Sequence, residues 1–193
     1  MTKLIRFALP IFACALIAAA ASIAPQDLAL QFDPAQTKVE FTLGDVLHTV
    51  HGAFRLKSGN LRFDPVTGRA AGELVVDAAS GDSGSGARDR RMNKNVLESI
   101  LFPEIVFRPD RVDGKLAPEG TSHVQLHGVF AMRGAEHEMT VPVEVEGAGG
   151  QYLATAKFAV PYVKWGMKNP STLFLRVNEQ VDITIHTVAK IAR

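Results

Sequence analysis

The sequence predicts an all-β fold, in which an antiparallel sheet of about eight strands closes into a barrel with one short α-helix. Apolar and polar residues alternate over most of the chain, which is the pattern of strands with one buried face. Turn-forming residues separate the alternating segments, and helical spacing is convincing only in the stretch Arg88–Phe107. Closure is favoured because a closed sheet exposes no edge strands.

Residues 1–24 have the pattern of a secretory signal peptide. Lys3 and Arg6 give a positive start, an alanine-rich apolar run follows, and small residues favour cleavage near Ala21 or Ala24. The apolar run is shorter than the roughly 20 residues of a membrane-spanning helix. We therefore expect residues 25–193 to form one barrel domain, in the periplasm or secreted from the cell.

Charge and cysteine content exclude several classes of protein. The 21 basic residues nearly balance the 20 acidic ones, and no basic stripe with interleaved aromatics is present, so no nucleic-acid partner is expected. The single cysteine, Cys14, lies in the expected signal peptide. The mature chain then has no disulfide and no cysteine-ligated metal.

Strands are expected on both sides of the helix. Gln26–Gln36 is interpreted as a lead-in, Lys57–Asn60 as a turn and Ser80–Gly86 as a loop. Before the helix, the alternating segments are Thr37–Leu43, Val50–Leu56, Leu61–Phe63 and Arg69–Ala78. After the helix, they are Glu104–Pro109 and Arg111–Leu116 around a bend at Pro109–Asp110, Val124–Met132, Met139–Val145, Tyr152–Val163 and Leu173–Thr187.

The predicted helix has one apolar face, formed by Met92, Val96, Leu97 and Ile100. Asp89 lies in its first turn, where the helix dipole favours an anion. Ser83 or Ser85 is expected to cap its start, and Phe102-Pro103 to end it. Its basic face, formed by Arg88, Arg91 and Lys94, is expected either to be a solvated surface or to contact lipid headgroups or an anionic ligand group.

The candidates for catalysis or metal binding are weak. His48 and His51 would point to opposite faces of a strand, and His123 and His127 would lie about 13 Å apart on one face, so neither pair forms a local metal site. A long-range site using His51, His127 or His137 stays open. Asp89 with Glu98 or Glu104 is expected to cap and form ion pairs rather than to act as a carboxylate pair. Phosphate-loop, nucleophile-elbow and dinucleotide motifs are missing from the sequence.

The interior of a barrel of about eight strands is either filled by side chains or holds one small apolar ligand. Large inward-facing phenylalanines, with Gly52, Gly72 and Gly128 expected to leave space, are compatible with a lined cavity. From these observations the sequence predicts an exported barrel that carries an apolar ligand.

Several motifs resemble the YceI-like family. They are Val39-Glu40-Phe41, Gly52-x-Phe54, Arg88-Asp89, Phe102 to Phe107, Leu126-His127-Gly128, the hairpin from Met132 to Val143, and the closing segment Val177–Ile185. The resemblance implies an extended lipocalin-like barrel that binds a long polyisoprenoid, with no catalytic centre and no cofactor. Two departures, Arg91-Met92 and Trp165–Pro170, are expected to reshape the mouth of the tunnel.

We therefore expect an exported carrier or storage protein for a polyisoprenoid or isoprenoid-quinone type of lipid. A transient membrane contact and a dimer are both compatible with the sequence. One alternative is an enzyme of this fold, a hydrolase or isomerase that uses His51 or His127 with a carboxylate. Another is a filled barrel that acts through its surface as an envelope stress or interaction protein. The residues predicted to bind lipid are Phe41, Phe54, Phe63, Leu74, Val76, Met92, Val96, Leu97, Phe107, Phe130, Val141, Val143 and Phe158.

Overall fold

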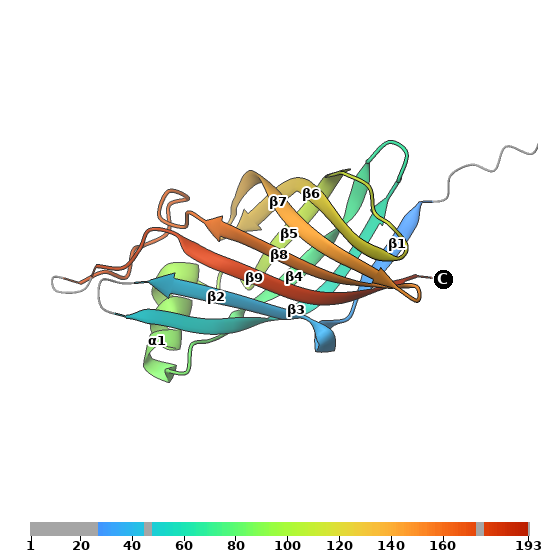
Figure 1. The fold of residues 1–193 in the computed structure, drawn as a ribbon. Helices are drawn as coiled ribbons and strands as arrows, with labels where there is room; N and C mark the ends of the chain where they lie inside the picture. The colour runs from blue at the N-terminus through green and yellow to red at the C-terminus, as the bar shows by residue number, and fades with distance from the viewer. Residues whose placement is uncertain (1–26, 45–47, 173–175, 193) are drawn as a thin grey trace, which may run out of the picture.

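The computed structural model describes residues 27–44, 48–172 and 176–192 (Figure 1). The expected signal peptide, its cleavage positions and Cys14 lie outside these ranges, as does the beginning of the last expected strand at Leu173. Within the described ranges, no helix is long and apolar enough to cross a membrane.

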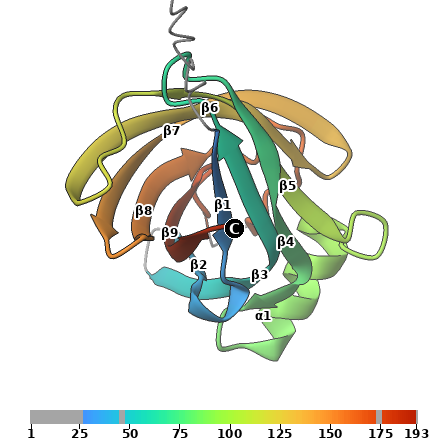
Figure 2. The same ribbon diagram turned by 90° about the vertical axis from the view of Figure 1, so that its right-hand side faces the viewer.

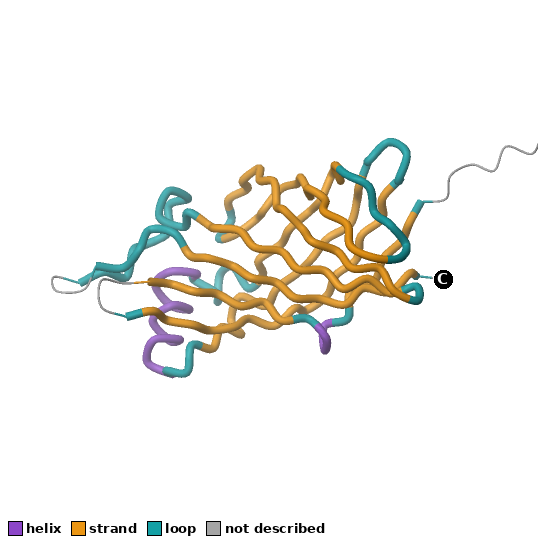
Figure 3. Tube along the Cα trace, viewed as in Figure 1, coloured by secondary structure: helices purple, strands orange, loops and turns teal. Residues whose placement is uncertain are grey.

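Nine strands and three short helical segments form the described part of the chain (Figures 1 and 3). The strands are β1 (Leu28–Phe32), β2 (Lys38–Gly44), β3 (Thr49–Phe63), β4 (Ala70–Asp82), β5 (Glu104–Asp113), β6 (Gly120–Met132), β7 (Ala135–Ala148), β8 (Gln151–Val160) and β9 (Val181–Ile191). The helical segments are the 3₁₀ turn η1 (Pro34–Gln36), helix α1 (Gly86–Arg91) and the π-helical turn η2 (Met92–Leu97).

The sheet closes into a barrel, as predicted. Its order is β3-β2-β9-β8-β7-β6-β5-β4, and β4 pairs again with β3. These neighbours all run antiparallel. Figure 2 looks along the barrel from the end at which β1 lies, and α1 lies at the opposite end (Figure 1). The fold is an all-β, lipocalin-like barrel of eight strands with β1 as an additional strand.

The prediction that Gln26–Gln36 is only a lead-in is wrong, because Leu28–Phe32 forms strand β1. β1 pairs with β3 and with β9, the same two neighbours that β2 has farther along the barrel. Leu30 and Phe32 are buried. The turn η1 therefore separates two strands that occupy the same position between β3 and β9.

The predicted turn at Lys57–Asn60 is also wrong, because β3 continues through it. The register of β3 on β4 shifts between Leu56 and Ser58. An extra residue in a strand reverses which positions face inward. This explains why Phe54 and Leu56 line the interior before the irregularity, and Leu61 and Phe63 after it.

The two strands predicted around Pro109–Asp110 are one strand, β5, with a register shift between Pro109 and Arg111. Phe107 lines the interior before the shift and Val112 after it. The other expected strands are present with different ends. β4 extends to Asp82 into the expected loop, β8 ends at Val160, and β9 begins at Val181.

The helical segment is shorter than predicted. It ends at Leu97 because Glu98 adopts a left-handed conformation, with φ of 50°. Such a residue reverses the chain direction at the end of a helix. Met92, Val96 and Leu97 pack against the interior as predicted, but Ile100 is 93% exposed, so its place on the apolar face is wrong.

The start of the helix also differs in detail from the prediction. Ser85 occupies the capping position, but its side chain makes no capping hydrogen bond. Ser83 instead donates from its backbone N–H and its hydroxyl to the Asp89 carboxylate. Arg88 donates to the hydroxyl and the carbonyl of Ser83, at 2.8 and 2.9 Å. Asp89 therefore joins the end of β4 to α1, without pairing with another carboxylate.

Candidate functional site

The barrel encloses one long apolar cavity with a volume of about 630 Å³. This volume lies within the roughly 300–1,000 Å³ of typical small-molecule sites. Val50 and Phe63 both line the cavity and lie at opposite ends of β3. Since a strand rises about 3.3 Å per residue, the cavity follows most of the length of the barrel. The interior is not filled by side chains.

The structure places every residue predicted to bind lipid in the wall of this cavity; their role in lipid binding stays a prediction. Phe54, Phe107 and Phe130 are only half-buried although they face inward, because part of their surface faces the cavity. The complete predicted set in the wall is Phe41, Phe54, Phe63, Leu74, Val76, Met92, Val96, Leu97, Phe107, Phe130, Val141, Val143 and Phe158.

The prediction missed part of the wall. Period-two spacing could have identified the residues that lie on strands, such as Ile105, Tyr152 and Ile183, whereas Met167 lies in the segment after β8, which has no strand periodicity. Those of β1 were overlooked because its segment was interpreted as a lead-in. The main missed residues are Leu30, Phe32, Ile105, Tyr152, Val160, Tyr162, Met167, Val181, Ile183 and Ile185.

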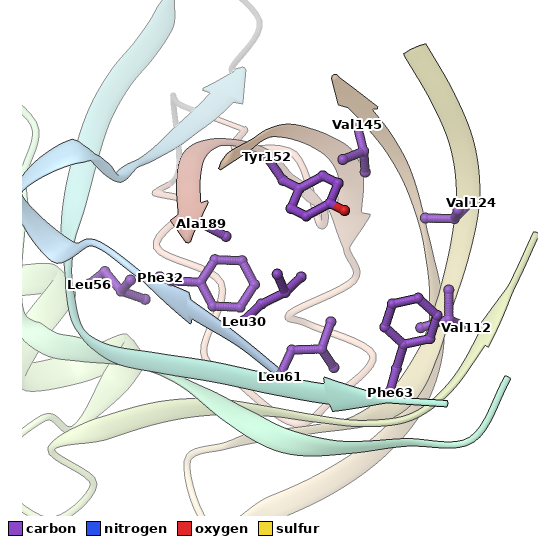
Figure 4. Close-up of a cluster of buried hydrophobic side chains, with 10 residues drawn as sticks. All are labelled: Leu30, Phe32, Leu56, Leu61, Phe63, Val112, Val124, Val145, Tyr152 and Ala189. Atoms are coloured by element: carbon purple, nitrogen blue, oxygen red, sulfur yellow. The ribbon is translucent and has the colours of Figure 1, made fainter. Parts of the chain in front are cut away.

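The end of the barrel beside β1 is packed by ten buried side chains (Figure 4). They come from seven strands, β1, β3, β5, β6, β7, β8 and β9. Leu30 and Phe32 of β1 lie among them, between Leu56 and Leu61 of β3 in the same view. All ten also line the cavity, which therefore reaches the end of the barrel remote from α1.

The α1 end of the cavity is framed by polar side chains. Ser83, Ser85, Arg88 and Arg91 line it there, beside Gly44. Arg91 is exposed, and its guanidinium makes no hydrogen bond or ion pair with the described residues. Two members of the predicted basic face, Arg88 and Arg91, thus reach the mouth of the cavity, whereas Lys94 is exposed outside it.

The segment that follows β8 covers the same end of the barrel. Trp165 stacks on His137 of β7, with ring centroids 4.1 Å apart, and packs 5.5 Å from the ring of Phe130. Arg133 donates to the Gly166 carbonyl at 2.7 Å and forms a 2.9 Å ion pair with Glu98. Through these two contacts Arg133, in the β6–β7 turn, links the end of η2 to the segment around Trp165. The Arg133–Glu98 pair confirms the ion-pairing role expected for Glu98, and Glu104 likewise pairs with Lys57.

Tyr162 is the cavity residue with a perturbed acidity. Its hydroxyl donates to the Asn178 carbonyl at 2.6 Å. Burial raises the pKa of Tyr162 to about 12, and the negative charge of Glu179 adds to the effect. The hydroxyl therefore stays neutral in the apolar cavity wall at physiological pH.

The expectation that three inward glycines leave space for a ligand is wrong. Gly52, Gly72 and Gly128 do not line the cavity. A Cβ atom on Gly52 would collide with the ring of Phe41, and one on Gly128 would collide with the Arg108 carbonyl. These glycines permit close packing within the wall.

The histidines do not gather at the cavity. His127 contacts Asp110 through Nδ1 at 2.7 Å, and His51 contacts the Thr42 hydroxyl at 3.1 Å; neither histidine lines the cavity. Among the described residues, no group of three or more histidine, cysteine or acidic residues could hold a metal ion. The alternative of an enzyme that uses these histidines on a ligand in the cavity gains no support from this arrangement.

Comparison with known proteins identifies the family. The family model of the YceI-like domain matches residues 30–189, which is nearly all of the described chain. The chain belongs to the YceI-like family. None of the curated proteins gives a match.

Solved structures of YceI-like and related proteins share the fold. Burkholderia cenocepacia BcnA is 20% identical, with a TM-score of 0.66, over 82% of this chain and 99% of BcnA. A polyisoprenoid binding domain from Saccharophagus degradans, implicated in plant cell wall breakdown, is 12% identical, with a TM-score of 0.67. The match covers 86% of this chain and 99% of that domain. The Campylobacter jejuni YCEI protein is 13% identical, with a TM-score of 0.57, and the match covers 70% of this chain and 81% of that protein. At these identities the likeness shows the fold, and family and cavity together indicate a lipid-binding barrel.

Proposed function

We propose that this YceI-like protein is an exported carrier or storage protein that holds one long apolar lipid inside its barrel. The observation that supports it most strongly is the continuous cavity of about 630 Å³, walled mainly by aliphatic and aromatic side chains. Burial of apolar surface contributes roughly 25 cal/mol per Å², so a long hydrocarbon chain can bind tightly with few polar contacts.

We further propose that the ligand is of the polyisoprenoid or isoprenoid-quinone type. The S. degradans neighbour is described as a polyisoprenoid binding domain, which supports this class. A cavity that follows most of the length of the barrel also suits a linear chain. The polar framing of the α1 end favours an orientation in which the head group lies near Arg88 and Arg91 and the tail extends towards β1.

Export is supported by the amino-terminal sequence pattern. Residues 1–24 have the charged start, the apolar run and the small residues of a secretory signal peptide. Long isoprenoids are almost insoluble in water, so a protein that encloses them would allow their storage or movement through the periplasm or outside the cell.

Native mass spectrometry of the protein purified from its own cell envelope tests this function. We expect a mass that exceeds the processed chain by one lipid, and denaturing extraction should release an isoprenoid. The mass of the bare chain also locates the cleavage site near Ala21 or Ala24. An empty protein that stays empty after incubation with isoprenoid quinones would contradict the proposal.

A further inference from the structure

Two neighbouring side chains at the α1 end of the barrel project into solvent. Ile100 is 93% exposed and Leu101 is 72% exposed. Single exposed aliphatic residues are common on protein surfaces and need no explanation. Two adjacent ones leave a larger apolar surface in contact with water, which is unfavourable unless something covers it.

The turn that carries Ile100 and Leu101 is firmly held. The Leu101 and Phe102 amides both donate to the Glu98 carbonyl, at 2.8 and 3.0 Å. The Glu98 side chain is fixed by its ion pair with Arg133. Ser99 is buried, and the Phe102 ring lies against Gly134. The flanking residues thus anchor the turn, and the two aliphatic side chains point outward from a defined backbone.

Positive charge accompanies this apolar pair. Arg90, Arg91 and Lys94 are exposed, and none of them forms an ion pair with a described residue. The carboxylates of the same segment are engaged elsewhere: Asp89 binds Ser83, and Glu98 binds Arg133. The segment from Arg90 to Leu101 therefore carries three exposed cations and two exposed aliphatic side chains.

We infer that Arg90–Leu101 is a docking surface for an anionic lipid bilayer. Ile100 and Leu101 would enter the interfacial layer, and Arg90, Arg91 and Lys94 would contact lipid phosphates. Interfacial binding of proteins combines these two contributions, and each Lys or Arg near an anionic membrane surface adds about 1 kcal/mol. Because Arg91 also lines the cavity mouth, docking brings the mouth towards the membrane.

A second copy of this chain fits the surface less well. Symmetric pairing through this segment would bring like charges together, which is unfavourable. A stable protein interface also buries about 1,200–2,000 Å², far more than two aliphatic side chains supply. The inference rests on surface residues alone, so it holds or fails independently of the lipid inside the barrel.

Vesicle sedimentation tests the inference, with protein purified from its own cells. Vesicles contain phosphatidylcholine, either alone or with one third phosphatidylglycerol. We expect binding to the anionic vesicles that falls by at least about tenfold in the double variant Ile100→Ser/Leu101→Ser. The matched control is Val66→Ser, because Val66 is also 72% exposed but lies in the β3–β4 turn. Its binding should be unchanged.

Further measurements separate docking on a membrane from pairing of two copies of the chain. Lys94→Ala should weaken binding to anionic vesicles by about fivefold, and added salt should weaken it further. Equal sedimentation of wild type and the double variant, or no binding to anionic vesicles, would overturn the inference. So would a dimer in analytical ultracentrifugation that the double variant dissociates, because the surface would then pair two copies. Retained quinone binding by the double variant would show that the cavity is intact.

Discussion

Tyr162 combines a buried hydroxyl with a defined hydrogen bond to the Asn178 carbonyl. A tyrosine in the unfolded chain loses its proton near pH 10, whereas burial raises the pKa of Tyr162 to about 12. Between these values the folded protein binds more protons than the unfolded chain. The free energy of unfolding therefore decreases as the pH rises through this interval, and Tyr162 contributes no such slope below it.

The variant Tyr162→Phe tests this coupling. It leaves the Asn178 carbonyl without its partner, so we expect a loss of about 1 kcal/mol in unfolding free energy at pH 7. Above pH 10 the difference between the two proteins should shrink, because the wild type alone bears the cost of a buried ionisable hydroxyl. Urea unfolding at pH 7, 9 and 11 measures this; a difference that stays constant with pH would contradict the assignment.

At the scale of single elements, the helical segment docks through Leu97 and not through Ile100. Leu97 is 6% exposed, whereas Ile100 is 93% exposed. We expect Leu97→Ala to destabilise the protein by about 2–5 kcal/mol and Ile100→Ala to change stability by less than about 0.5 kcal/mol. Thermal or urea unfolding of the two variants measures the difference. Equal losses would mean that the helix continues past Glu98.

Sequence periodicity could predict most elements because each long strand has one face towards the interior. β6 alternates without interruption from Val124 to Met132, and its end at Met132 was predicted correctly, although the strand begins earlier, at Gly120. Register irregularities are different. In β3 and β5 the inward-facing side chains switch from even to odd positions, or the reverse, within one strand. In the sequence this looks the same as two strands separated by a turn.

The elements that were missed depend on contacts distant in sequence. β1 has five residues, follows Pro25 and precedes Pro34, and its pairing with β3 and β9 has no local signal beyond three apolar residues. The end of the helix depends on Glu98 adopting a left-handed conformation against Arg133, 35 positions away in the chain. Spacing of apolar residues does not encode either contact.

At the scale of the whole molecule, closure was predictable as the economical arrangement, because it leaves no exposed edge strand among eight alternating strands. Closure in turn placed the inward-facing residues around one space, so the wall of the cavity was predicted better than its mouth. The mouth depends on where α1 and the segment around Trp165 lie, and side-chain periodicity carries no information about that position. The two arginines at the mouth were candidates only because they lie on the predicted helix.

The central claim is that the interior of the barrel is the lipid-binding site. Ala156 lines the cavity on β8, and Ala159 on the same strand is exposed on the outside. Phenylalanine at position 156 would occupy part of the cavity without burying a charge, and at position 159 it would leave the cavity unchanged. The pair Ala156→Phe and Ala159→Phe therefore separates occupation of the cavity from general effects of a larger side chain.

The decisive measurement is a titration of delipidated protein with a long-chain isoprenoid quinone, followed by the fluorescence of Trp165. Trp165 is the single tryptophan of the chain and packs against the cavity residue Phe130. We expect saturation at one quinone per chain for the wild type and Ala159→Phe, and affinity at least about tenfold weaker for Ala156→Phe. Equal affinity of all three folded proteins would contradict binding inside the barrel.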